Sequence, residues 1–247
     1  MLFEIERCLR RAPYLHVYEL GDLDPREAPH CTWFHSADAV ALLYRGLAVP
    51  TLVAFADDDA DGLHELLVRR AAELPDRFYA HLSAGLESAL AHRFDAELLG
   101  VNLKLGLTGL RATATDEPTV LSIDDAEAVA RFYAAHYPGS YFEPANLERG
   151  PYLALSDDRG LVAIAGVHVY SPLVRVAAVG NVATRGDARG RGYARRITGL
   201  LCRRLLDEVD VIGLNVRADN AAAIACYRGL GFERVGDFRE WRFVRRA

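Results

Sequence analysis

Apolar and polar residues alternate with a period of two along much of the second half of the chain, as they do in half-buried strands. Turn residues at Asp157–Gly160 and Ser171–Pro172 interrupt this alternation. The pattern predicts three consecutive strands at residues 152–156, 161–170 and 174–184. Two further strands are predicted at residues 210–217 and 238–244. The close spacing of the first three indicates an antiparallel arrangement with short turns.

Helical periodicity fills the gaps between these strands. Residues 192–209 place Ala194, Ile197, Leu201 and Leu205 on one face, which predicts an amphipathic helix. A second helix is predicted at residues 123–137, with Ser122 as N-cap and Pro138 after its end. A short helix follows at 221–228. Residues 141–150 are polar and irregular.

The first half of the chain shows the same order of elements with a weaker pattern. Strands are predicted at residues 14–20, 32–34, 39–44, 52–56, 78–82 and 98–107, and helices at 61–73 and 86–94. We therefore expect an α/β (α+β) protein in which helices flank a mixed, mostly antiparallel central sheet. The repeated order suggests two domains, 1–115 and 117–247, joined by a linker near residues 113–118.

Composition is that of a globular protein, with 51% apolar and 26% charged residues among 247. No apolar run reaches the length of a membrane span, and acids interrupt the first residues, unlike in a secretory signal. Cys8, Cys31, Cys202 and Cys226 show neither paired nor metal-ligand spacing. These features predict a cytoplasmic protein with reduced thiols, without a bound metal and without membrane attachment.

Charge is distributed unevenly along the chain. Residues 1–116 carry 11 basic and 18 acidic side chains, whereas residues 117–247 carry 18 and 16. Seven arginines lie between Arg185 and Arg204, so the positive charge is concentrated around one segment. A nucleic-acid-binding protein usually spreads basic residues among aromatic ones over a longer surface. We therefore expect a small anionic partner and no nucleic acid.

This basic segment combines glycines and arginines where the helix at 192–209 begins. A helix start offers backbone N–H groups without internal partners, and its dipole end is positive. Gly190 and Gly192 allow close backbone approach and a positive φ. Arg185, Arg189, Arg191, Arg195 and Arg196 add charge, with Asp187 as the single acid among residues 185–196. The segment is predicted to hold a diphosphate.

Two motifs in this region resemble those of the GNAT acyltransferase superfamily. Arg189-x-x-Gly192-x-Ala194 matches its Arg/Gln-x-x-Gly-x-Gly/Ala pattern. About 30 residues further on, the run from Asn220 through Ala223 and Tyr227 to Gly231–Phe232 resembles its closing motif. The resemblance covers residues 117–247. It implies the GNAT fold, acetyl-CoA as cosubstrate, and direct acetyl transfer to a primary amine of a small molecule or a peptide.

The resemblance also implies roles for individual residues. Backbone groups of Val182, Ala183 and Thr184 would contact the pantetheine arm. The diphosphate would lie against Arg189, Gly190, Arg191, Gly192, Tyr193 and Ala194. Tyr227 would protonate the departing thiolate, because a phenol is only slightly less acidic than a thiol. Asn220 would contact the cofactor or simply cap the following helix, and Tyr227 would otherwise be a core residue.

The first half resembles a degenerate second copy of the same fold, a layout that occurs in tandem members of this superfamily. Its counterpart of the cofactor loop is the acidic run from Asp57 to Gly62. Four carboxylates there would repel a diphosphate. We therefore expect coenzyme A to bind only to the second half.

The general base and the acceptor are less well defined. Glu143 in the irregular segment, His168 on a predicted strand, and an ordered water are all candidates to deprotonate the amine. No motif identifies the acceptor, and acetyl is preferred over longer acyl groups only through the superfamily. The main alternative function is an acyl-CoA-binding sensor without turnover. A dinucleotide-binding fold fits poorly, because Arg195 occupies the position of the third glycine of its fingerprint.

Overall fold

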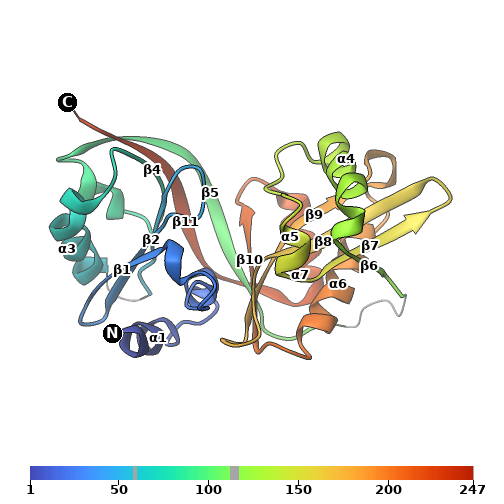
Figure 1. The fold of residues 1–247 in the computed structure, drawn as a ribbon, viewed down its shortest axis with the longest axis horizontal. Helices are drawn as coiled ribbons and strands as arrows, with labels where there is room; N and C mark the ends of the chain where they lie inside the picture. Colours follow the sequence, from blue (N-terminus) through green and yellow to red (C-terminus); the bar gives the residue numbers. More distant parts are fainter. Residues whose placement is uncertain (58–59, 112–116, 247) are drawn as a thin grey trace. The chain divides into compact units, whose positions relative to one another are not determined.

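The computed structural model describes residues 1–57, 60–111 and 117–246 (Figure 1). Two compact units are present. The first consists of Met1–Leu105, Val216–Asn220 and Arg234–Ala247, and the second of Gly106–Asn215 and Ala221–Glu233. Each unit is an antiparallel-rich sheet flanked by helices, which confirms the predicted fold class. Most of the predicted linker lies outside the described residues, so a boundary near residue 116 stays a prediction.

The strands of the first unit lie in the order β1-β2-β3-β4-β11-β5. Their bounds are Cys31–Ser36 for β1, Ala39–Tyr44 for β2, Thr51–Ala54 for β3, Arg77–Leu82 for β4, Phe94–Leu107 for β5 and Phe232–Arg245 for β11. β3 and β4 are parallel, whereas β1/β2, β2/β3 and β4/β11 are antiparallel. Phe78, Ala80 and Leu82 of β4 are buried at every second position, as period-two patterning requires.

Helix α3 (Ala60–Arg70) covers one face of this sheet through Leu63, Leu66 and Leu67. The predicted helix at 86–94 is a 3-10 helix, Leu86–Leu90, and Phe94 already begins β5. Two further 3-10 turns occur at Ala28–His30 and Ala71–Glu73.

Two N-terminal helices differ from the sequence prediction. Helix α1 (Leu2–Leu9) was not predicted, although Ile5 and Leu9 are buried four residues apart. The strand predicted at 14–20 is wrong, because residues Val17–Gly21 form helix α2. His16 and Glu19 contact each other at 2.9 Å across one helical turn, a spacing that a strand cannot provide.

The last strand joins the first unit, although it lies at the end of the second half of the sequence. β11 pairs with β4 through Trp241 opposite Ala80 and Phe243 opposite Phe78. The rings of Phe243 and Phe78 are stacked at 5.1 Å, and Phe94 packs edge-on against Phe78 at the same distance. Burial of these aromatic rings explains why β11 belongs to this core.

The second unit contains the strand order β10-β9-β8-β7-β6, with β9 and β10 parallel and the other pairs antiparallel. The strand bounds are Thr119–Leu121 for β6, Tyr152–Asp157 for β7, Gly160–Ser171 for β8, Val176–Thr184 for β9 and Val211–Arg217 for β10. The helix bounds are Ala126–His136 for α4, Asn146–Arg149 for α5, Tyr193–Leu205 for α6 and Ala221–Leu230 for α7. A 3-10 turn, Ile123–Asp125, precedes α4.

Local sequence explains these helices. Ser122 and Asp125 form the predicted cap, since the Ser122 N–H donates to the Asp125 carboxylate at 2.8 Å. α4 packs Val129, Phe132 and Tyr133 into an apolar cluster that includes Tyr152 of β7. α6 packs against β7, β8 and β9 through its buried stripe, which contains Ile197, Leu201 and Leu205 as predicted. Ala194, the fourth residue of the predicted stripe, is only half-buried.

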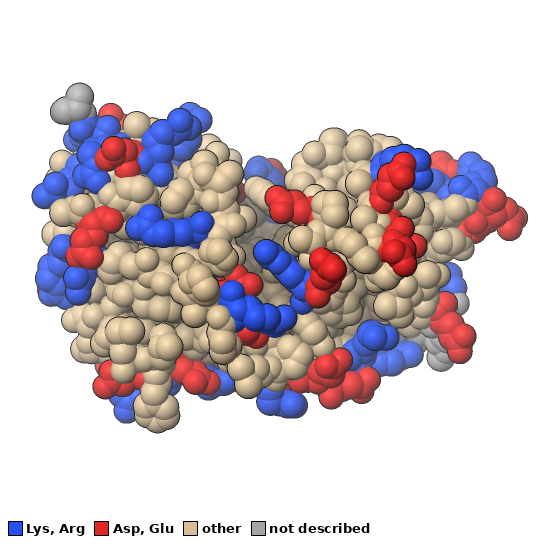
Figure 2. All heavy atoms as spheres, in the orientation of Figure 1, with Lys and Arg blue, Asp and Glu red and all other residues tan. Residues whose placement is uncertain are grey.

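Arginines and acids are interspersed over the face in Figure 2. In the first unit, Arg245 pairs with Asp76 at 2.5 Å and Arg246 with Asp95 at 2.8 Å. Such exposed pairs each contribute little to stability. None of the helices within the described ranges combines the length and apolar character needed to cross a membrane. The cytoplasmic location stays a prediction.

Gly231 has the most demanding backbone position in the second unit, and its replacement by alanine should be strongly destabilising. Its φ is +104°, and a Cβ there would overlap the carbonyl oxygen of Gly109. We expect Gly231→Ala to lower the free energy of unfolding by about 3 kcal/mol, because positive φ and a backbone overlap add up. Gly139→Ala is the matched control, since no atom lies near its added Cβ. Equal denaturant midpoints for the two variants would contradict this explanation.

Candidate functional site

The loop between β9 and α6 has the backbone that the glycine pattern predicts. Gly190 and Gly192 have φ of +76° and +82°, which non-glycine residues rarely adopt. A Cβ added at either position would meet no atom within 4 Å, so the space above both glycines is open. Gly192 is the N-cap of α6. A ligand can therefore approach the main chain closely at this point.

The start of α6 offers unused hydrogen-bond donors. The first main-chain hydrogen bond of the helix runs from Arg196 N–H to Gly192 O at 3.0 Å. The N–H groups of Tyr193, Ala194 and Arg195 precede that bond and have no main-chain acceptor among the described residues. Together with the positive end of the helix dipole, these donors are arranged in a way that favours an anion.

The arginines near this loop have different roles. Arg189 donates to the carbonyl oxygen of His136 at 2.8 Å, and Arg195 donates to that of Gly229 at 2.8 Å. Carbonyl contacts leave the guanidinium charge uncompensated, so both residues add positive charge beside the helix start. Arg191 is exposed in the loop itself.

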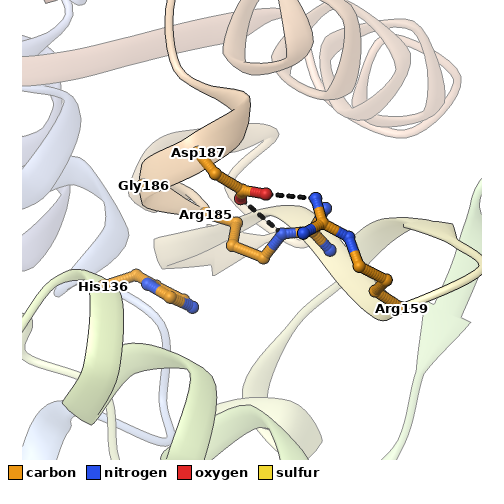
Figure 3. Close-up of a pocket in the computed structure, with 5 residues that line it drawn as sticks. All are labelled: His136, Arg159, Arg185, Gly186 and Asp187. Atoms are coloured by element: carbon orange, nitrogen blue, oxygen red, sulfur yellow. Dashed lines mark hydrogen bonds and ion pairs between the residues drawn. The ribbon is translucent and has the colours of Figure 1, made fainter.

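Arg185 does not add free positive charge, contrary to the sequence prediction. It donates to Asp157 at 2.5 and 2.9 Å. It also donates to Asp187 at 2.7 Å, and Arg159 pairs with the same carboxylate (Figure 3). Hydrogen bonds from Arg185 hold the pKa of both carboxyl groups below the usual range. A shallow pocket of about 370 Å³ lies among Arg159, Arg185, Gly186, Asp187 and His136. Because Arg159 and Arg185 are paired with Asp157 and Asp187, this pocket offers little uncompensated positive charge to an anion.

β9 separates from β10 before it reaches the loop. In the second unit the two strands pair only from Val176–Val211 to Ala178–Gly213, although β9 continues to Thr184. On its other side β9 stays paired with β8 up to Thr184. The main-chain groups of Val182–Thr184 that face away from β8 have no partner strand there, although Thr184 O accepts a hydrogen bond from Arg189 Nε at 3.4 Å. An extended ligand could bind beside them like an additional strand.

The corresponding strands of the first unit remain together. β3 and β4 pair along the whole of β3, from Thr51–Tyr79 to Ala54–Leu82. Beyond them, Ser83 N–H donates to Ala54 O at 3.1 Å, and Ala56 N–H donates to Ser83 Oγ at 3.0 Å. Asp58 and Asp59 of the acidic run lie outside the described residues. The first unit thus lacks, in its described part, the strand separation found in the second.

Tyr227 and Asn220 lie in the predicted elements. Tyr227 is half-buried on α7, and its ring packs edge-on against Phe232 at 5.9 Å. The contact from Arg195 to Gly229 links α6 to the end of α7 and keeps Tyr227 on a helix next to the one that bears the loop. Asn220 is exposed in the turn after β10, where its N–H donates to Arg217 O at 3.0 Å.

The two candidate bases differ in their surroundings. Glu143 is exposed, and its own main-chain N–H donates to Asn146 Oδ1 at 2.6 Å. His168 lies on β8 beside β9, its side chain reaches solvent, and it is hydrogen-bonded to Asn181. Burial by neighbouring atoms lowers the pKa of His168, and the Asn181 hydrogen bond offsets part of this effect. The lowered pKa favours the neutral form of the His168 imidazole.

Sequence reasoning missed a buried polar cluster in the first unit. Lys104, the single lysine of the chain, is 1% exposed, and its ammonium lies 3.8 Å from the centre of the Phe55 ring. Its Nζ and the Oε2 of buried Glu19 have no hydrogen-bond partner among the described residues. Burial and the charge of Lys104 lower the pKa of nearby His81 to about 4. No group of metal-ligating side chains occurs in the described parts of either unit.

Several known proteins are similar to this chain in sequence. Residues 120–232 match the Acetyltransferase (GNAT) family. The chain is 32% identical over 218 residues to the mycothiol acetyltransferase of Mycolicibacterium vanbaalenii, covering 74% of this chain and 70% of that protein. A 50-residue stretch is 52% identical to the N-alpha-acetyltransferase RimI of Mycobacterium tuberculosis, covering 19% of this chain and 29% of that protein.

Solved structures show the same fold across nearly the whole chain. A GCN5-related N-acetyltransferase from Kribbella flavida gives a TM-score of 0.63 at 18% identity, covering 94% of this chain and 95% of its own. An acetyltransferase of the GNAT family from Colwellia psychrerythraea gives 0.59 at 13% identity, with 97% of both chains covered. The family match and the similarity to mycothiol acetyltransferase identify an acyltransferase. The chain belongs to the GNAT acetyltransferase family.

Proposed function

We propose that this chain transfers an acetyl group directly from acetyl-CoA to a primary amine of a small molecule or a peptide. The observation that carries the proposal is the separation of β9 from β10 directly before a loop with open main-chain donors. An extended pantetheine arm fits the first feature, and a diphosphate fits the second. The relatives named above act on different acceptors, so the acceptor class is kept broad.

Each group of residues has a defined part in this mechanism. Main-chain groups of Val182, Ala183 and Thr184 hold the pantetheine arm so that the thioester lies beside β9. The diphosphate accepts hydrogen bonds from the main chain of Gly190, Arg191, Gly192, Tyr193 and Ala194, and Arg189 adds charge. Asn220 directly precedes α7, and its contact with the cofactor is taken from the resemblance to the family. In the first unit, continuous β3–β4 pairing and the acidic run argue against a second cofactor site.

The chemical step is attack by a neutral amine on the thioester carbonyl carbon. The C–N bond forms, the C–S bond breaks, and the electron pair of that bond goes to sulfur. We assign Tyr227 as the acid that protonates this sulfur, since the pKa values of phenol and thiol differ little. The acceptor would enter near residues 141–150, which contain the exposed Tyr141.

An acceptor screen tests this function. Purified protein with excess acetyl-CoA is incubated with small amines, amino sugars and peptides, and free thiol release is followed. We expect acetyl-CoA to raise the melting temperature, since it binds only the folded state, and at least one amine to accelerate thiol release. Binding without amine-dependent release would support the sensor alternative. A melting shift with NADH and none with acetyl-CoA would contradict both.

Tyr227→Phe tests the assignment of the acid. We expect kcat to fall about 10- to 100-fold while KM for acetyl-CoA changes little, because the hydroxyl acts after the cofactor has bound. The matched control is Tyr137→Phe, an exposed tyrosine at the end of α4. Steady-state kinetics measure both variants. Unchanged turnover in Tyr227→Phe would remove this residue from the mechanism.

A further inference from the structure

The pairing of β8 with β9 contains two irregularities that compensate each other. Ala165 stands opposite two residues of β9, Asn181 and Val182, because Ile164 pairs with Ala183 and Gly166 with Gly180. Three residues further along β8 the reverse occurs: Val167 and Val169 pair with adjacent Val179 and Ala178, which leaves His168 as an extra residue. The register before and after the two bulges is therefore the same.

Bulges leave residues unpaired and re-aim their side chains, and they occur preferentially next to active sites. Because the two bulges offset each other, they leave the overall register of β8 and β9 unchanged. What the two bulges change is the direction of His168 and Asn181. Asn181 has a φ of +51°, in the left-handed region that asparagine adopts more readily than other non-glycine residues.

Two glycines at the bulges between β8 and β9 leave room for aromatic rings. Gly166 and Gly180 are direct cross-strand partners, so their α-carbons face the same side of the sheet. A Cβ on Gly166 would overlap the Tyr152 ring, and a Cβ on Gly180 would overlap the His168 ring. The two rings thus lie flat against neighbouring glycines, with Asn181 beside them.

Hydrogen bonds determine which way the Asn181 amide points. The hydroxyl of Tyr152 donates to Val167 O at 3.3 Å, so its lone pair accepts from Asn181 Nδ2 at 2.9 Å. The carboxamide oxygen of Asn181 is then the atom left for His168. Tyr133 fixes the same residue from α4 by donating to its main-chain oxygen at 2.5 Å.

These contacts determine the protonation state of the His168 ring. A ring N–H donates to the Asn181 oxygen, so the other ring nitrogen carries a lone pair. Of these three contacting residues, His168 is exposed to solvent, whereas Asn181 and Tyr152 are buried. The titratable groups that contact the Asn181 end are Tyr152 and Tyr133. Burial raises the pKa of Tyr152 to about 12 and that of Tyr133 further, so both stay neutral.

We propose that His168 is the general base that deprotonates the acceptor amine, and that Asn181 is the residue that positions it. The inference rests on the proposed amine acetylation. His168 lies over Gly180, two residues before Val182 on the strand that would carry the thioester. One proton passes from the ammonium group to the free ring nitrogen and then to solvent. The amine loses a second proton as the C–N bond forms. This proton restores the Tyr227 hydroxyl, which has given its own proton to sulfur.

The test compares amines that differ in basicity. In His168→Gln, kcat/KM for an alkylamine should fall about 100- to 1,000-fold near pH 7, where the amine is mostly protonated. The loss should be at least ten times smaller for trifluoroethylamine, which is already neutral. A structural role would reduce both equally. KM for acetyl-CoA and the melting-temperature shift that it causes should stay at wild-type values, which shows that the variant is folded.

Asn181→Asp tests the positioning role separately. A carboxylate next to the imidazole favours its protonated form. The acid limb of the kcat/KM profile should therefore move to higher pH than in the wild type, and Asn181→Ala should lower kcat without that shift. Glu143 is the competing candidate for the general base, and Glu143→Gln tests it in the same assay.

Two outcomes would overturn the inference while leaving the proposed function intact. One is full alkylamine turnover in His168→Gln, and the other is a selective loss in Glu143→Gln. If the wild type releases no thiol with any amine, the proposed function itself fails, and the His168 variants need not be made.

Discussion

Gly192→Glu should weaken the binding of acetyl-CoA at least about 100-fold, which corresponds to about 2.7 kcal/mol. The carboxylate would lie at the helix start where the diphosphate accepts its hydrogen bonds, so two anions would compete for the same donors. The added side chain also occupies space that is open in the structure. Isothermal titration with acetyl-CoA measures the change.

Gly192→Asn is the matched control for the effect of the backbone. Asparagine tolerates a φ near the +82° of Gly192 better than other residues do, and it carries no charge. We expect it to retain affinity within about tenfold of the wild type, because most hydrogen-bond donors stay open. Wild-type affinity in Gly192→Glu would mean that the diphosphate binds elsewhere. An equal loss in both variants would attribute the effect to backbone strain instead of charge.

The first unit should lose about 3 kcal/mol of stability between pH 6.5 and pH 4 through His81. Its pKa in the folded protein is lowered to about 4 by burial first and by the charge of Lys104 second, whereas Glu19 acts in the opposite direction. In this window the unfolded chain binds a proton at His81 and the folded protein does not. Acidification therefore favours unfolding, and the contribution returns as the pH rises through 6.5.

Denaturant unfolding at a series of pH values isolates this contribution. His81→Gln should flatten the decline in unfolding free energy between pH 6.5 and pH 4 relative to the wild type. The control is His92→Gln, because His92 is exposed and lies in the same unit. If the His81→Gln and wild-type curves stay parallel over this range, His81 is not the group that makes the fold acid-sensitive.

Local patterns predicted most of the second unit. Period-two strands and short turns defined β7, β8 and β9, and the stripe from Ile197 to Leu205 defined α6. These features depend on neighbours in the sequence, so a single chain reveals them. The positive φ at Gly190 and Gly192 could also be expected, because glycine is the residue that adopts it freely.

Features that depend on distant residues could not be predicted in this way. β11 belongs to the first unit because Phe243 stacks on Phe78. These two residues are far apart in the sequence. Arg185 pairs with Asp157, which lies 28 residues away, so its charge is not available to a ligand. The signal that could have warned of this is the acid-rich turn at Asp157–Asp158 next to a basic loop.

The two bulges between β8 and β9 were also not predicted from the sequence. Val167 to Val169 continue the apolar alternation of β8, and nothing in that run indicates that His168 is an extra residue. The facing glycines Gly166 and Gly180 were the available sign, since two glycines within core strands indicate the close approach of bulky groups. The buried Lys104 was missed because a lone lysine in a strand is usually solvated.

A crystal structure of the complex with acetyl-CoA tests the central claim most directly. We expect the diphosphate oxygens to lie within hydrogen-bond distance of the N–H groups of Gly190 to Ala194. We also expect the pantetheine amides to pair with Val182 to Thr184, on the side of β9 that β10 leaves free. A diphosphate bound away from the start of α6, or a cofactor bound to the first unit, would contradict it.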